Sequence, residues 1–169
     1  MELLDIYDKD RRFTGKVCLR GEPRQPGEYM MAVCVWVYDG AGKLLLTRRA
    51  PEKSFAGTWE NSGGAAQSGE DSRTAISREL REETGLLARP EEFEFLCTTW
   101  DSGSFFDHYC LQRRVDLSQI RLQPGETDDV MWADFDTVHQ MIRDGKICSI
   151  IAEQFLRMEQ ELRKRQTAQ

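Results

Sequence analysis

The sequence lacks the features that mark a membrane-spanning or a disulfide-stabilised protein. Its longest wholly apolar run, residues 29–38, is far shorter than the ~18 or more residues that a membrane-spanning helix needs. The five cysteines are odd in number and widely spaced, with no Cys-x-x-Cys pair, which disfavours a disulfide framework and a zinc site. The N-terminus begins acidic, so no secretory signal is expected. These absences predict a cytoplasmic protein without a membrane partner.

The sequence also lacks a basic excess. It has 23 Lys and Arg against 29 Asp and Glu, a formal net charge of −6. An acidic chain is a poor passive binder of nucleic acid or anionic lipid. A small anion could still bind where a metal ion and a basic side chain lie together. The 169 residues contain no repeat, linker or low-complexity tract, so we expect a single domain over residues 1–169.

Patterning predicts several strands before the first helix. Short strands are expected at residues 3–7 and 15–19, within an N-terminal extension, residues 1–28, that ends in a loop rich in proline and glycine. Residues 29–38 are rich in β-branched and aromatic side chains without alternation, which favours a central strand covered on both faces. The next residues predict a hairpin turn at 39–42 with its return strand at 43–47, followed by an irregular glycine-rich loop at 50–64.

A helix is predicted after that loop. Asp71 and Ser72 are N-cap candidates, Gly85 is a natural C-terminal stop, and Ile76 and Leu80 form a buried stripe. The remaining elements expected are strands at residues 93–100, 105–115 and 130–135, a helix at 135–144, and a last helix with an apolar stripe of Ile151, Phe155, Met158 and Leu162. This order argues for an α/β fold with a mixed sheet between helices. The last helix and the first strand could serve a homodimer.

Four glutamates are concentrated in residues 63–86: Glu70, Glu79, Glu82 and Glu83. Glu79 and Glu83 are four residues apart and share one helix face, with Glu82 on its flank. Such like charges weaken an isolated helix and raise one another's pKa values. A bound hard cation offsets this repulsion, and an all-oxygen cluster suits Mg²⁺ or Mn²⁺. The alternative is a solvated acidic face with local ion pairs to arginine.

The spacing of the segment favours the metal-binding interpretation. Its residues are, in order, Gly64, five residues, Glu70, seven residues, Arg78–Leu80, one residue, Glu82–Glu83, one residue, and Gly85–Leu86. This pattern resembles the Nudix box at every specified position. A random chain of this length would match with a probability on the order of 10⁻⁷. The strand and loop that precede the box also look like those of Nudix proteins.

The resemblance implies a Nudix hydrolase, an α/β/α sandwich with a mixed central sheet that cleaves a nucleoside diphosphate linked to another moiety. By their places in the box, Glu79 and Glu83 look like the principal metal ligands. Glu82 looks like a third ligand or the general base. The carbonyl of Gly63 and the carboxylate of Glu70 look like further metal contacts. Mg²⁺ is the implied cofactor, with Mn²⁺ as the other possibility.

The implied mechanism is water attack at one phosphorus of a pyrophosphate. Metal ions neutralise charge and acidify the water, and a carboxylate then takes its proton. Glu82, Glu83 and Arg78 form the expected catalytic set, in which Arg78 looks like the residue that orients the glutamates and Glu82 is the first candidate for the base. The alternative source of the base is an acidic loop, itself readable as an ordinary exposed turn, with Glu126, Asp128 and Asp129.

Three residues before the box are candidates for contact with a small-molecule diphosphate substrate. The resemblance places a phosphate-binding arginine at the end of the preceding strand, where Arg49 stands, and Lys53 follows in the loop. The alternative for such residues is an ordinary exposed strand end. Trp59 could stack on a base or another apolar group of the ligand, and could equally plug the core.

Two other functions compete with hydrolysis. Residues 5–61 also look similar to isopentenyl-diphosphate isomerases, which share the fold. That chemistry uses a cysteine in the loop before the box and a histidine-rich metal site, whereas this loop is Asn61–Gly64 and no histidine precedes His108. The other rival is a non-catalytic Nudix module that senses a nucleotide. Such modules usually have damaged glutamates, and all four are present here.

Overall fold

The computed structural model describes residues 2–101 and 103–167. Its strands are β1 (Leu3–Tyr7), β2 (Phe13–Leu19), β3 (Met30–Tyr38), β4 (Lys43–Arg49), β5 (Trp59–Glu60), β6 (Ser62–Ala65), β7 (Glu94–Asp101), β8 (Ser104–Gln112) and β9 (Thr127–Asp134). Its helices are α1 (Ser72–Thr84), α2 (Phe135–Arg143) and α3 (Ser149–Thr167), with short 3₁₀ turns η1 (Pro90–Glu92) and η2 (Leu117–Gln119).

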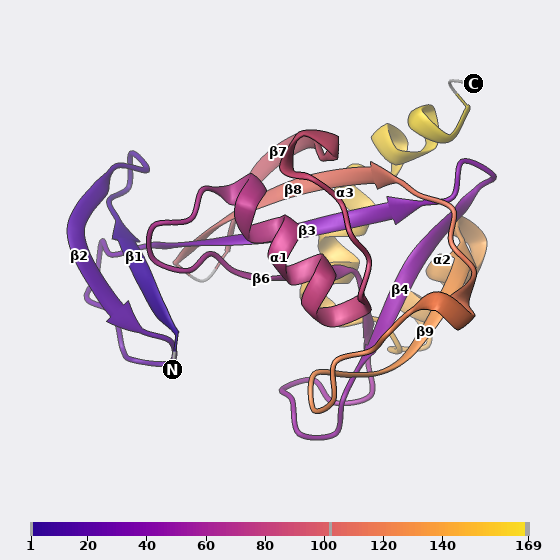
Figure 1. Ribbon diagram of the computed structural model, residues 1–169, viewed down its shortest axis with the longest axis horizontal. Helices are drawn as coiled ribbons and strands as arrows, with labels where there is room; N and C mark the ends of the chain where they lie inside the picture. The colour runs from indigo at the N-terminus through magenta and orange to yellow at the C-terminus, as the bar shows by residue number, and fades with distance from the viewer. Residues whose placement is uncertain (1, 102, 168–169) are drawn as a thin grey trace.

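The main sheet is mixed and has helices on both faces (Figure 1). Its strand order is β5-β4-β3-β8-β7, with β6 beside β3 and β9 beside β4. β3 and β8 are parallel, and the other pairs are antiparallel. One apolar cluster packs the sheet against α1, and a second packs it against α2 and α3. The predicted α/β sandwich with a mixed central sheet is confirmed.

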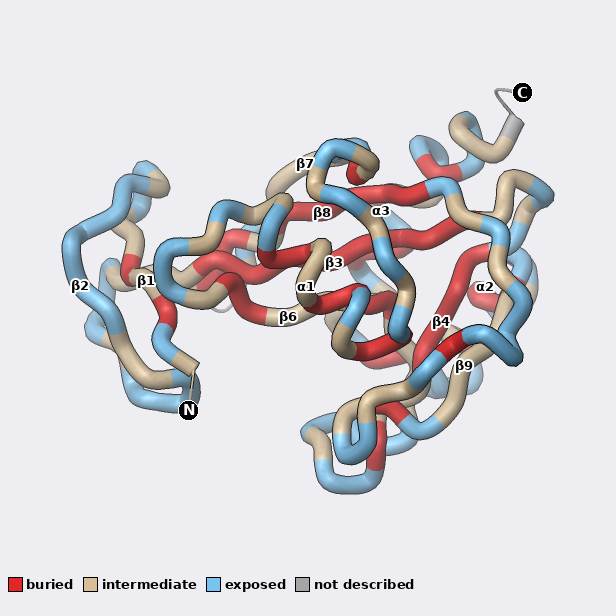
Figure 2. The backbone as a smooth tube through the Cα atoms, in the orientation of Figure 1, coloured by how far each residue is buried: buried red, intermediate tan, exposed pale blue. Residues whose placement is uncertain are grey.

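The central strand β3 is buried along nearly its whole length (Figure 2). Val33 and Val35 belong to the cluster under α1, whereas Trp36 and Tyr38 belong to the cluster under α2 and α3. Successive side chains of a strand point to opposite faces, so a strand covered on both sides needs apolar residues at every position. This explains the apolar run without alternation, as predicted.

The hairpin after β3 opens almost at once. The turn forms, with the Asp39 carboxylate accepting from the backbone N–H groups of Ala41 and Lys43. However, β3 and β4 pair only where Tyr38 faces Leu44, and then diverge. β6 takes the place beside β3, and β5 and β9 pair with β4. The expected irregular loop therefore contains two short strands that bridge the diverging pair.

Helix α1 begins and ends where its sequence predicts. The Asp71 side chain accepts from the Thr74 N–H at 2.7 Å, which caps the N-terminus. Gly85 ends the helix in the left-handed conformation at φ 73°. Ile76 and Leu80 are fully buried against the sheet. Glu79 and Glu83 share this inward face, so the helix carries its carboxylates toward the interior.

The last two helices complete the second face of the sheet. Phe155, Met158 and Leu162 of α3 are buried and Ile151 is half-buried, which confirms the predicted stripe. Along the residues that the structure describes, no helix combines the length and apolar character needed to cross a membrane.

The N-terminal segment forms a separate two-stranded sheet, β1 with β2, at one end of the molecule (Figure 1). Leu4 and Ile6 of β1 are buried. Arg11, in the turn between the strands, forms an ion pair with the buried Asp107 of β8. The extension predicted for residues 1–28 is therefore a hairpin and a loop, and the hairpin is fastened to the main sheet.

We predict that Gly85→Ala destabilises the protein more than Gly145→Ala. Both glycines have positive φ, 73° and 67°, and so share the ~1–2 kcal/mol cost of a side chain in the left-handed region. A Cβ on Gly85 would also lie 2.9 Å from the Cβ of Arg121, whereas one on Gly145 would meet nothing within 4 Å. Urea unfolding of the two variants checks this, and equal losses would contradict the contact.

Candidate active site

The glutamates of α1 line a polar cavity of about 80 Å³ beside β6. Its walls come from segments far apart in sequence, and the lining residues are Glu2, Arg20, Arg49, Lys53, Glu60, Gly63, Glu79, Glu82, Glu83, Gln123 and Glu126. Among these, six carboxylates face three cationic side chains. The cavity therefore has an excess of negative charge.

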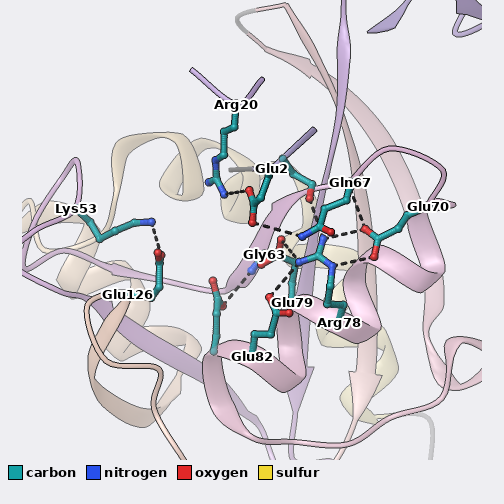
Figure 3. A network of polar contacts seen from close by, with 12 residues as sticks. Glu2, Arg20, Lys53, Gly63, Gln67, Glu70, Arg78, Glu79, Glu82 and Glu126 are labelled. Carbon is teal, nitrogen blue, oxygen red and sulfur yellow. Dashed lines mark hydrogen bonds and ion pairs between the residues drawn. The ribbon is translucent and has the colours of Figure 1, made fainter. Parts of the chain in front are cut away.

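Arg78 organises the box by binding several of its groups at once (Figure 3). Its Nε and Nη2 donate to the two carboxylate oxygens of Glu70 at 2.8 and 2.9 Å. Its Nη1 donates to Glu79 at 2.9 Å and to Glu82 at 3.1 Å, and Nη2 also donates to the Ala65 carbonyl at 3.0 Å. The hydrogen bond to Glu70 is the main cause of the raised pKa of Arg78. This geometry supports the predicted orienting role of Arg78.

Glu70 does not line the cavity, and its role as an outer metal or water contact stays a prediction. Its carboxylate is held by Arg78 and by the backbone N–H of Gln67, which donates at 2.9 Å. The hydrogen bonds of Arg78 and Gln67 outweigh partial burial and lower the pKa of Glu70. Glu70 is therefore placed to position Arg78, and it stabilises the loop before α1.

The two glycines before the box make room for different neighbours. A Cβ on Gly64 would overlap the carboxylate of Glu79, so only glycine lets that carboxylate lie against β6. A Cβ on Gly63 would overlap the backbone of β3 at Val33. Gly63 lines the cavity, and its N–H donates to Glu83 at 3.3 Å. A metal contact of its carbonyl stays a prediction.

Glu79 and Glu83 are each only 8% exposed. Burial raises the pKa of Glu79 against the opposing effect of Arg78. Burial, together with the charges of Glu60 and Glu79, raises the pKa of Glu83 well above its ordinary value. Within residues 2–101 and 103–167, Glu83 has no ion-pair partner. A buried carboxylate without a cation is costly, so this position calls for a positive ligand.

The cationic residues of the cavity are each paired with a carboxylate. The Nη1 of Arg49 donates to both carboxylate oxygens of Glu60, at 2.8 and 2.7 Å, and Lys53 pairs with Glu126. Arg49 and Lys53 both line the cavity with the glutamates of α1, and their contact with a substrate phosphate stays a prediction. Glu60 was missed, because it stands in a segment expected to be irregular and its register beside β4 could not be read from the sequence.

Trp59 and two of the acidic residues predicted for the site lie outside the polar cavity. Trp59 packs against the cluster under α2 and α3, and Arg48 lies over its ring at 5.7 Å. It does not line the cavity, so the core alternative describes it better than substrate stacking. Asp128 and Asp129 form ion pairs with Arg48. Of the acidic loop, Glu126 alone lines the cavity, because β9 carries the next carboxylates away along β4.

A second cavity of about 340 Å³ adjoins the first and shares Arg20, Arg49, Glu60 and Gly63 with it. Its walls include many apolar side chains, among them Phe55, Phe106, Ile150 and Ile151. Arg20, which lines both cavities, and Glu2, which lines the polar one, were not predicted as site residues. Nothing in the sequence places the N-terminal hairpin beside the box. A polar cavity that adjoins a larger, partly apolar one suits a ligand with an anionic end and a bulkier end.

The donor chemistry of the polar cavity fits a hard divalent cation. Glu79, Glu82 and Glu83 supply oxygen ligands alone, as Mg²⁺ and Mn²⁺ prefer. The raised pKa values of Glu79 and Glu83 reflect a negative charge that a cation would offset. Over the described ranges, no three acidic, imidazole or thiol side chains are already arranged to hold a metal ion.

The helix of the box carries buried glutamates and lies on a mixed sheet between helices, the arrangement that the resemblance to Nudix proteins predicts. The sequence profile of the NUDIX domain matches residues 28–149. The chain belongs to the Nudix hydrolase family, as the box spacing predicts.

Relatives extend beyond hydrolases. An uncharacterized Nudix hydrolase of Listeria innocua is 29% identical over 148 residues, which cover 86% of this chain and 88% of the relative. An isopentenyl-diphosphate Delta-isomerase of Aromatoleum aromaticum is 32% identical over 139 residues, 78% of this chain and 70% of that protein. The similarity to the isomerases noted in the sequence is thus confirmed.

Solved structures share the fold. A crystal structure of a Deinococcus radiodurans protein has a TM-score of 0.77 at 24% identity and covers 92% of this chain and 98% of that one. A bifunctional NMN adenylyltransferase/ADP ribose pyrophosphatase from Francisella tularensis, complexed with AMP and a manganese ion, has a TM-score of 0.61 at 20% identity. That match covers 83% of this chain and 43% of the other.

We predict that alanine at Gly63 mainly lowers stability, whereas alanine at Gly64 mainly displaces the Glu79 carboxylate. Gly63→Ala should lower the unfolding free energy by roughly 1–3 kcal/mol, because the new methyl group overlaps the backbone of β3. Gly64→Ala should cost less stability, because the Glu79 side chain can move, but it should displace that carboxylate. Thermal unfolding and a crystal structure of Gly64→Ala check both statements. An undisplaced Glu79 would contradict the second.

We predict that Glu83→Gln stabilises the metal-free protein at neutral pH. The folded pKa of Glu83 is raised above its ordinary value of 4.5, so its stability contribution is full below about pH 4.5 and is lost as pH rises through the folded pKa. The gain should be largest at pH 8 and should shrink toward pH 4.5, because the unfavourable charged form of Glu83 disappears as the pH falls.

Urea unfolding in chelator at pH 5 and pH 8 measures this difference. Glu82→Gln is the matched control, because the Glu82 side chain is 36% exposed and has Arg78 as its partner. A Glu83→Gln protein that is less stable than wild type at pH 8 would contradict the prediction.

Proposed function

We propose that the protein hydrolyses a pyrophosphate bond in a nucleoside diphosphate linked to another moiety, with Mg²⁺ or Mn²⁺ as cofactor. The observation that carries this proposal is the buried Glu83, which has no cationic partner among the described residues and lies in the same cavity as Glu79 and Glu82. The Francisella tularensis structure, an ADP ribose pyrophosphatase with AMP and a manganese ion, supports the metal and the kind of substrate by analogy of fold.

Glu79 and Glu83 would hold the metal, with the Gly63 carbonyl as a further ligand and Glu82 as either a third ligand or the general base. When bound, the metal would neutralise charge on the phosphate oxygens and would make the attacking water more acidic. Glu82 is exposed enough to meet water and is held by Arg78, so it can accept the proton of the attacking water at its carboxylate. Glu126, which also lines the cavity, is the second candidate for this role.

Arg49 and Lys53 would bind the phosphate groups. Both are already in the cavity, and each can exchange its carboxylate partner for a phosphate oxygen. The bulkier part of the substrate would occupy the adjoining cavity. The reaction then needs positioning and charge compensation more than covalent help, as is general for phosphoryl transfer.

We further propose that the protein acts in the cytoplasm on a small molecule, without a nucleic acid or membrane partner. The cysteines at positions 18, 34, 97, 110 and 148 are free thiols, as a reducing compartment allows. The net charge of −6 disfavours polyanionic surfaces. Homodimerisation stays a prediction from the amphipathic last helix.

The test is a Mg²⁺-dependent hydrolysis screen over nucleoside diphosphate derivatives, with phosphate release coupled to an added phosphatase. We expect Glu83→Gln and Glu79→Gln to lose most turnover, and Glu82→Gln to lower kcat about 100-fold or more if Glu82 is the base. Glu91→Gln is the control, since Glu91 is exposed in η1 outside the cavity. Hydrolysis that persists in the presence of a chelator would contradict the proposed mechanism.

The same screen separates the rival functions. An arm with isopentenyl diphosphate tests isomerisation, which the isomerase relative makes worth measuring. Tight nucleotide binding without turnover, unaltered by Glu83→Gln, would instead identify a sensing module.

A further inference from the structure

The N-terminal hairpin brings a cation to the catalytic cavity. Arg20 directly follows β2, and its side chain lines both the polar cavity and the larger one beside it. Glu2, which precedes β1, lines the polar cavity next to it. The Arg20 guanidinium donates to the Glu2 carboxylate at 2.7 Å (Figure 3). A segment outside the box therefore forms one wall of the site.

The position of this wall is fixed by contacts with the loop that leads into α1. The Asp5 carboxylate accepts from the Ser68 hydroxyl at 2.6 Å and from the Gly69 N–H at 3.0 Å. The Ser68 N–H donates to the Leu3 carbonyl at 2.8 Å. The ion pair of Arg11 with Asp107 holds the far end of the hairpin. Because hairpin and box are joined directly, the reach of Arg20 into the cavity is a built feature of the fold.

Arg20 is the most exposed of the three cations in the cavity. Its side chain is 50% exposed, compared with 17% for Arg49 and 23% for Lys53. In the described part of the chain its side chain makes one ion pair, with Glu2. Arg49, by contrast, is held by both oxygens of Glu60 and by Ser54. An arginine with a free edge can take a phosphate through two parallel hydrogen bonds.

The carboxylates around Arg20 affect its pKa. Although burial opposes its charge, the ion pair with Glu2 and the charges of Glu79 and Glu126 raise the pKa of Arg20. The influence is mutual, since the charge of Arg20 offsets part of the rise that burial causes in the pKa of Glu79. Arg20 therefore lies within electrostatic reach of both the box helix and the loop before β9.

We propose that Arg20 binds the diphosphate group of the substrate at the boundary of the two cavities, exchanging Glu2 for phosphate oxygens. The inference rests on the proposed hydrolysis of a diphosphate and adds a binding residue from outside the box. Glu2 competes with the substrate for the guanidinium and holds it in place when the site is empty. The hairpin is thus part of the substrate-binding site.

The test measures binding of inorganic pyrophosphate in the presence of Mg²⁺ by titration calorimetry, and KM and kcat with the best substrate of the screen. We expect Arg20→Ala to weaken pyrophosphate binding about tenfold and to raise KM more than it lowers kcat. Arg20→Lys should recover part of the loss, because it keeps the charge without the two-pronged geometry. Glu2→Gln should tighten binding by severalfold, because the competitor is removed.

Arg12→Ala is the matched control. Arg12 lies in the same hairpin, carries the same charge and is exposed. It does not line either cavity, so its variant should bind pyrophosphate as wild type does.

The outcomes separate this inference from the proposed function. Arg20→Ala that binds pyrophosphate as tightly as wild type, or that loses no more than Arg12→Ala, would overturn the role of Arg20. Weaker binding in Glu2→Gln would overturn the exchange of partners. A wild-type protein that binds pyrophosphate through Arg20 but hydrolyses nothing in the screen would refute the hydrolase proposal and leave the binding role standing.

Discussion

The site depends on the repulsion between carboxylates that α1 and its neighbours hold inside a small cavity. Glu79 and Glu83 are buried, and Glu60 adds a third carboxylate that raises the pKa of Glu83. Arg78 compensates part of this charge by binding Glu70, Glu79 and Glu82 together. The remaining excess makes the cavity a natural position for a divalent cation, at a cost in stability that the rest of the fold has to offset.

The architecture explains why the cavity lies where it does. β3 and β4 start as a hairpin but pair at only one position before they diverge. β5 then pairs with β4 and β6 with β3, so the chain between them turns inward beside α1. Gly63 and Gly64 allow this close approach, because any larger residue would overlap β3 or Glu79. The two cavities border this bridge, and both include Gly63.

Sequence patterning predicted the local structure well where a single physical rule dominated. The limits of α1 followed from Asp71 as its cap and Gly85 as its stop. The burial of β3 on both faces followed from its unbroken apolar composition. Patterning missed β5 and β6, because two- and four-residue strands are defined by their partners and carry no periodicity of their own.

The sequence by itself determined the family and the helix face that carries Glu79 and Glu83, because both depend on spacing within a few helical turns. Only the tertiary structure decided which distant residues meet that face. It brought Glu60 and Arg20 into the cavity, packed the partly buried Trp59 against the core, and paired Asp128 with Arg48. Such contacts depend on strand pairing and register between segments far apart in sequence, which local composition does not encode.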